Sequence, residues 1–208
     1  GGESPISLLA LPRITHEEGI TMTVQPTSPG APGIVDRVKN ILLNPKAEWE
    51  KIAAEPADPS KLFVGYALPL LALAAVCSFI GMAVIGLPFI GRMPMIFALT
   101  QAISQVVMGL ISLFVTSFIA NALAPTFGSK QDLTQAQKLI VYGSTAGLLA
   151  GVLAIIPTLG MLAIIGGIYS IVLIYFGLPA VMGTPADKQI VYLAVLIVAC
   201  VVVFWVMA

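Results

Sequence analysis

The chain has 208 residues, of which 58% are hydrophobic and 10% are charged, whereas a soluble domain has about 25% charged residues. Ten basic and ten acidic side chains give a formal net charge of zero, so there is no basic surplus with which to bind nucleic acid. The two cysteines lie far apart in apolar segments and form neither a disulfide framework nor a zinc-binding spacing. The composition predicts an all-α membrane protein that has the lipid bilayer as its surroundings and no cofactor.

Residues 1–33 are rich in Pro, Gly, Ser and Thr and show no sustained apolar period, which predicts a disordered N-terminal tail. The chain begins with Gly1, and Met22 is a plausible native start, so we interpret part of residues 1–21 as vector-derived or upstream-translated sequence. His16, the one histidine, falls in this tail and is expected to be solvated rather than catalytic.

Residues 34–61 form the next predicted unit, a cytoplasmic segment of short amphipathic helices. In the first helix, one face has apolar residues at helical spacing, and the other face is expected to present Asp36, Arg37 and Lys39 to solvent. Asn44 and Pro45 are typical of the start of a second helix, which runs to about Glu55. The candidate contact residues of the two helices are Trp49, Ile34, Val38, Ile41 and Leu42.

Two interpretations of this helix pair stay open. It lies on the membrane surface with Trp49 as an aromatic anchor, or it is a soluble cap that packs on the membrane bundle. In either arrangement, residues 34–55 are the part of the chain best suited to bind a cytoplasmic protein partner.

Residues 62–208 are predicted to be a transmembrane domain, because crossing a hydrocarbon core of about 30 Å takes about 20 apolar residues in a helix. Pro69 and Pro179 fall within predicted spans and are expected to cause kinks. The fold class predicted is thus a five-transmembrane-helix bundle preceded by short cytoplasmic helices, with spans at about 62–85, 96–123, 139–156, 159–182 and 190–207.

The basic residues outside these spans are distributed very unequally. With spans that alternate in direction, nine Lys and Arg residues fall on the side of the N-terminus and only Arg92 falls on the other. The positive-inside rule therefore predicts a cytoplasmic N-terminus and an external C-terminus.

No Asp, Glu, Lys, Arg or His occurs within the five predicted spans. Proton relays, ion-coupled transporters and intramembrane enzymes place such side chains there. We therefore expect no catalytic residues, no metal ligands and no enzymatic activity.

The second predicted span has a polar stripe of Gln101, Gln105, Ser112 and Thr116, which lie within roughly 60° of arc on a helix. Such side chains form hydrogen bonds between packed helices, and the alternative is that they line a path for a small or uncharged solute.

The third predicted span has the pattern GxxxGxxxG at Gly143, Gly147 and Gly151, with Ala146 and Ala150 on the same face. This spacing lets two helices approach closely. The partner helix is either another span of this chain or a second copy, so a homo-oligomer is one interpretation. The short turn at Ile156 and Pro157 predicts an antiparallel hairpin of the third and fourth spans.

Five stretches of the sequence together resemble the Yip family of membrane proteins: residues 42–45, 49–52, 141–145, 156–157 and 166–179. The resemblance covers residues 34–207 and implies a five-span bundle with a cytoplasmic N-terminal region. Eukaryotic members are associated with Golgi and vesicle traffic and with prenylated Rab-type GTPases. This chain lacks their Asp-Leu-Tyr-Gly-Pro motif and long cytoplasmic domain, which favours a bacterial member in the inner membrane.

The resulting functional hypothesis is a non-enzymatic membrane scaffold or adaptor, with a role in membrane organisation or a process like trafficking, that recruits a partner or senses the membrane surface through residues 34–55. The alternatives are a small channel along the polar stripe and lipid handling or bilayer shaping by the surface helices.

Overall fold

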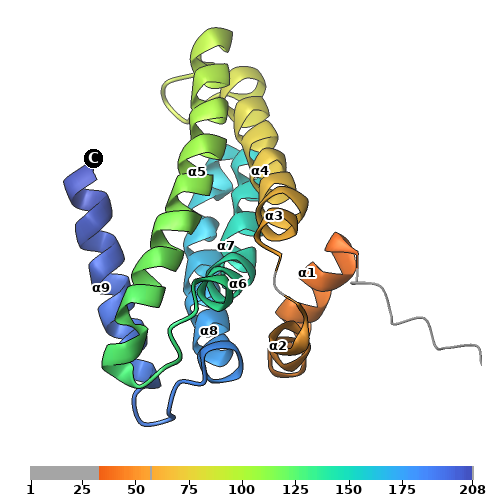
Figure 1. The fold of residues 1–208 in the computed structure, drawn as a ribbon. Coiled ribbons are helices and arrows are strands. Elements are labelled where there is room, and N and C mark those ends of the chain that lie inside the picture. Colours follow the sequence, from red (N-terminus) through yellow and green to blue (C-terminus); the bar gives the residue numbers. More distant parts are fainter. Residues whose placement is uncertain (1–32, 57, 208) are drawn as a thin grey trace, which may run out of the picture. The chain divides into compact units, whose positions relative to one another are not determined.

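The computed structural model describes residues 33–56 and 58–207. The tail predicted over residues 1–33 and the plausible native start Met22 lie outside the described residues, except for Gly33, the residue that precedes the first helix. Within the described residues the regular structure is helical, apart from an isolated bridge between Leu87 and Gly91. Figure 1 shows the helices in chain order.

Two short helices come first, α1 (Ile34–Leu43) and α2 (Pro45–Ala54). Asn44 separates them with a non-helical backbone, and Pro45 begins α2 at a position where its missing N–H costs nothing. α1 packs on α2, and α2 packs along α8 of the membrane bundle.

The first long apolar segment is Pro59–Ile85, made of α3 (Pro59–Leu62), the π-helical η1 (Phe63–Ala67), α4 (Leu68–Ile80) and the π-helical η2 (Gly81–Ile85). Asp58 caps it by accepting the backbone N–H of Ser60 at 3.0 Å and of Lys61 at 3.3 Å. The π-helical turn η1 comes directly before Pro69, whose ring cannot fit a regular α-helical turn. A kink was predicted at Pro69, and what the structure has next to it is a π-helical turn that ends at Ala67.

A tight turn leads into α5 (Met95–Leu123), which ends in the 3₁₀ turn η3 (Ala124–Phe127). Gly86 and Gly91, with φ of +97° and +85°, adopt backbone angles that favour glycine. The turn makes α5 antiparallel to α4, and the two helices pack together.

The third and fourth segments form the predicted hairpin. The third consists of α6 (Leu133–Gly143), α7 (Thr145–Ala150) and the 3₁₀ turn η4 (Gly151–Ile155), and the fourth of the 3₁₀ turn η5 (Pro157–Leu162) and α8 (Ala163–Met182). The side chain of Asp132 caps α6. α6 begins six residues before the predicted span, so Lys138 lies inside an apolar helix that was expected to have no charge.

Four helical segments are long and apolar enough to cross a membrane: Pro59–Ile85, Met95–Phe127, Leu133–Ile155 and Pro157–Met182. α9 (Gln189–Met207) is also apolar, but its apolar stretch Gln189–Val202 is shorter than these four segments. The chain is therefore an all-helical membrane protein with four helices of spanning length in the described residues.

The core of the described bundle is formed by apolar side chains from α2, α4, α6, α8 and α9, among them Leu139, Leu173, Leu178 and Tyr192, each fully buried. Many large apolar side chains face outward on α5, α8 and α9 instead, for example Ile164, which is 63% exposed. An outer surface of this kind suits contact with lipid rather than with water.

Candidate functional site

The helix pair α1–α2 is held on the bundle by a buried apolar contact. Ile41, Trp49 and Ile52 are fully buried. The Trp49 ring lies against Gly177 of α8, where an added Cβ would come within 2.8 Å of the ring atoms Cε2 and Cζ2 and 2.6 Å of Leu139. Glycine at this position thus lets the indole approach the α8 backbone. In this arrangement α2 packs on α8, and Trp49 has no exposed surface with which to contact a membrane.

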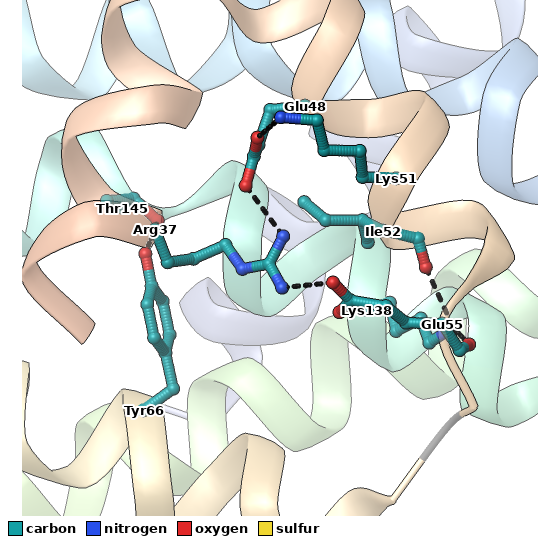
Figure 2. A network of polar contacts seen from close by, with 8 residues as sticks. All are labelled: Arg37, Glu48, Lys51, Ile52, Glu55, Tyr66, Lys138 and Thr145. Carbon is teal, nitrogen blue, oxygen red and sulfur yellow. Dashed lines mark hydrogen bonds and ion pairs between the residues drawn. The ribbon is translucent and has the colours of Figure 1, made fainter. Parts of the chain in front are cut away.

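Next to this contact is a buried ionic cluster centred on Arg37, which is only 3% exposed. Its Nη1 donates a hydrogen bond to Glu48 Oε1 at 2.7 Å, and its Nη2 donates one to Glu55 Oε1. Figure 2 shows the guanidinium between these two carboxylates, that of Glu48 on α2 and that of Glu55 directly after α2. Arg37 was expected on the solvent face of α1, and the structure places it inward because its charge is matched by two partners.

Electrostatics keep Arg37 ionised in this buried place. Burial alone lowers the pKa of a guanidinium, but the hydrogen bond and charge of Glu55, together with the charge of Glu48, raise the pKa of Arg37. The guanidinium also lies 5.4 Å from the centroid of the Tyr142 ring on α6, within the range of a cation–π contact. Arg37 thus links α1 to α2 and to the membrane bundle.

Lys138 of α6 completes the cluster from the membrane side. This lysine is 4% exposed, and its ammonium donates to the backbone carbonyls of Ile52 at 2.9 Å and Glu55 at 2.5 Å. These carbonyls lie at the C-terminal end of α2, where carbonyl groups lack partners within the helix and a positive charge is favourable. Lys138 therefore caps α2 from another element.

A second set of hydrogen bonds connects η1, α6 and α7 beside this cluster. Thr145 Oγ1 donates to the Tyr142 carbonyl at 2.6 Å, so the Tyr66 hydroxyl, 2.8 Å away, donates to Thr145 Oγ1. Farther along, the Tyr169 hydroxyl of α8 donates to the Leu42 carbonyl at the end of α1 at 2.7 Å. The N-terminal helices are thus bonded to the bundle at several points.

This cluster has the chemistry of a structural clamp. Its carboxylates are engaged by Arg37 or, for Glu48, also by Lys51 at 3.3 Å. In residues 33–56 and 58–207, no group of three or more His, Cys, Asp or Glu side chains is placed to hold a metal ion. The arrangement can fix α1–α2 in position, and it leaves no unpaired acid or base poised for catalysis.

The side of α1 that faces away from the bundle is the α1 outer face, defined by Val35, Asp36, Lys39 and Leu43. Val35 is 77% and Leu43 67% exposed, and Asp36 and Lys39 are exposed beside them. Ile34 is also exposed, whereas Val38 and Leu42 are half-buried against the core. Of the residues expected to contact a partner, only Ile34 is exposed.

The small-residue motif divides its contacts between two helices of the same chain. A Cβ on Gly143 would meet Ile174 of α8, and one on Gly147 would come within 3.3 Å of Ser170, whose Oγ accepts the Gly147 N–H at 2.8 Å. A Cβ on Gly151 would instead lie 2.9 Å from Ala74 of α4. Ala146 and Ala150 lie against Gly166 of α8.

The polar stripe of α5 lies at the border between its buried and exposed faces. Gln101 is exposed, whereas Gln105, Ser112 and Thr116 are half-buried. Thr116 accepts a hydrogen bond from Cys200 of α9 at 3.8 Å, in a groove of about 490 Å³. The rest of that groove is apolar and lined by α8 and α9, so Thr116 takes part in the packing of α5 on α9.

Glu48, Glu55 and Lys138 were not singled out from the sequence, and neither was the burial of Arg37. The available signal was the presence of one glutamate on α2 and another directly after it, within reach of an arginine on α1. Charge patterning alone is typical of a solvated face, and only the packing of α2 on α8 shows that this side of the pair is buried.

A comparison with protein-family models matches residues 39–207 to the Yip1 domain. Comparisons with curated proteins and with solved structures gave no significant match. The family match begins inside α1 and extends to the end of α9, so it includes both the membrane bundle and the clamp residues on α2 and α6.

Proposed function

The chain belongs to the Yip family of membrane proteins, and from that premise we propose that it is a non-enzymatic scaffold whose α1 outer face binds a cytoplasmic protein partner. The observation that supports this proposal is the contrast between the two sides of α1. Its inner side is clamped by Arg37 and Ile41, which are 3% and 0% exposed, while Val35 and Leu43 on its outer side are 77% and 67% exposed.

A docking surface of this kind gains from being held rigid. A partner that binds a preformed surface does not have to supply the free energy needed to order it. The α1 outer face combines two exposed apolar side chains with one acidic and one basic residue, and protein interfaces contain both apolar and polar contacts. The clamp would present this surface at a fixed position beside the membrane.

The membrane topology that accompanies this proposal has five spans, with α9 as the fifth. The sequence count of nine basic residues against one, in which Lys138 is now seen to lie inside α6, supports a cytoplasmic location for α1, α2, the loop before α6 and the loop before α9. In a bacterial cell, which the missing eukaryotic motif favours, the membrane would be the inner membrane.

Site-specific photocrosslinking in native membranes tests the proposal. A photoreactive amino acid in place of Leu43 is expected to give one protein adduct of defined mass, and the substitution Val35→Glu in the same chain is expected to remove it. The control position is Ile165, 64% exposed on α8, where adducts with lipid are expected. If Leu43 yields only the lipid adducts seen at Ile165, α1 lies on the bilayer and the scaffold proposal is wrong.

A further inference from the structure

One face of α5 is left without a partner in the described bundle. Gln101 and Ser104 are exposed, Met108 is 52% exposed, and Gln105 and Ser112 are half-buried. At 100° per residue these five positions span roughly 100° of the helix. The residues of α5 buried in the bundle lie on another face: Ala98, Ala102, Leu113, Ser117 and Ala120.

α9 contacts α5 toward the C-terminal end of α5. The Tyr192 hydroxyl donates to the Ala120 carbonyl at 2.5 Å, and Cys200 donates to Thr116. Beyond this region α9 diverges from α5, as Figure 1 shows. The polar face between Gln101 and Ser112 thus lies to the N-terminal side of these α9 contacts.

Two hydroxyl side chains of α5 outside this face have hydrogen-bond partners within their own helix. Thr100 and Ser117 donate to carbonyls of their own helix, Ile96 at 2.9 Å and Leu113 at 2.7 Å. In the part of the chain that the structure describes, no hydrogen bond involves the side chains of Gln101, Ser104 or Gln105. Gln105 lies ten residues inside a 33-residue apolar segment, and an amide without a partner in hydrocarbon is unfavourable by several kcal/mol.

We propose that a second copy of this chain docks on this face, α5 against α5, about a two-fold axis along the membrane normal. Such an axis places each residue at the same depth as its counterpart. A glutamine amide is both donor and acceptor, so Gln101 and Gln105 can each bond to the same residue of the other copy. Ser104, which is small, lets the two helices approach closely. Pairing is more favourable in the bilayer than in water, because the hydrocarbon contains no water to form hydrogen bonds with the amides.

The first test measures dimerisation in liposomes by fluorescence energy transfer as the protein is diluted with lipid. The double substitution Gln101→Leu and Gln105→Leu is expected to raise the dissociation constant about tenfold or more, given the typical strength of hydrogen bonds between membrane helices. Ile168→Leu, at a position 58% exposed on α8, is the control and should have no effect. An unchanged dissociation constant in the double variant would overturn the proposal.

Disulfide formation gives a second readout that does not depend on the folding of the glutamine variants. In a chain with Cys77 and Cys200 replaced by alanine, Ser104→Cys is expected to form a covalent dimer in native membranes under mild oxidation. Leu99→Cys, at a position 46% exposed on another face of α5, should remain monomeric. Equal crosslinking at the two positions, or none at position 104, contradicts the proposed interface.

Discussion

The guanidinium of Arg37 and the carboxylate of Glu48 meet at 2.7 Å with only 3% and 1% of their side chains exposed. Transfer of two charges out of water is costly, and their attraction compensates only when both are present with good geometry. Glu55 and the Tyr142 ring provide the remaining contacts of the guanidinium. This pair therefore makes the position of α1 depend on a match of charges inside the protein.

Removal of the arginine charge is expected to destabilise the protein strongly. Arg37→Met leaves Glu48 buried without its main partner, and the free energy of unfolding should fall by about 3–5 kcal/mol. The measurement is thermal unfolding of purified protein in mild detergent.

Lys61→Met is the matched control for this experiment, because Lys61 pairs with Asp58 at 3.6 Å but is 87% exposed. Its loss should change the free energy of unfolding by about 0–1 kcal/mol. Equal effects of Arg37→Met and Lys61→Met would show that the Arg37 cluster is solvated, against the structure described above.

Trp49 gives a separate test of how α2 is attached. Trp49→Ala empties the contact with Gly177 and Leu139, and the expected cost is about 3–5 kcal/mol of folding free energy. Protease should then cut α1–α2 faster while the membrane bundle remains intact. Leu43→Ala, on the α1 outer face, is expected to change stability by no more than about 0.5 kcal/mol. A Trp49→Ala protein as stable and protease-resistant as the parent would place the indole outside the bundle.

Two adjacent glycines of α8 provide a test of close helix packing. A Cβ on Gly166 would lie 2.8 Å from the Ala146 carbonyl oxygen, whereas a Cβ on Gly167 meets nothing within 4 Å. Gly166→Ala should destabilise the protein by about 1–3 kcal/mol through overpacking. Gly167→Ala should be neutral or stabilise it by up to about 1 kcal/mol, since alanine favours helix. The measurement is the thermal unfolding midpoint of each variant. A lower midpoint for Gly167→Ala than for Gly166→Ala would contradict the packing of α7 on α8.

The sequence predicts the long apolar elements well because the bilayer requires uninterrupted apolar helices. The second predicted span, 96–123, differs from α5 by one residue at its start, and the fourth, 159–182, ends with α8 at Met182. The chain turns at Ile156, between η4 and η5, and Pro157 begins η5, where the sequence predicts the turn of the hairpin.

The interior of the clamp is not predictable from local patterns. Helical periodicity treats Arg37 as a surface residue, because its pairing depends on Glu48 and Glu55, which lie 11 and 18 residues away. Lys138 was expected in a loop because a charge usually ends an apolar segment. Its partners are backbone carbonyls of α2, 86 and 83 residues away in sequence, and no composition rule identifies such acceptors.

Thiol labelling tests most directly whether α1 is clamped with one face inward and the other toward the cytoplasm. Two variants are compared in a chain with Cys77 and Cys200 changed to alanine: Leu43→Cys, at a position that is 67% exposed, and Ile41→Cys, at a position that is 0% exposed. A membrane-impermeant maleimide is added to inside-out vesicles that contain each variant. We expect Leu43→Cys to react about tenfold faster or more than Ile41→Cys, and Arg37→Met to remove most of that difference. Equal labelling rates at the two positions without the Arg37 substitution would contradict the clamp, and labelling of Leu43→Cys only in right-side-out vesicles would contradict the orientation.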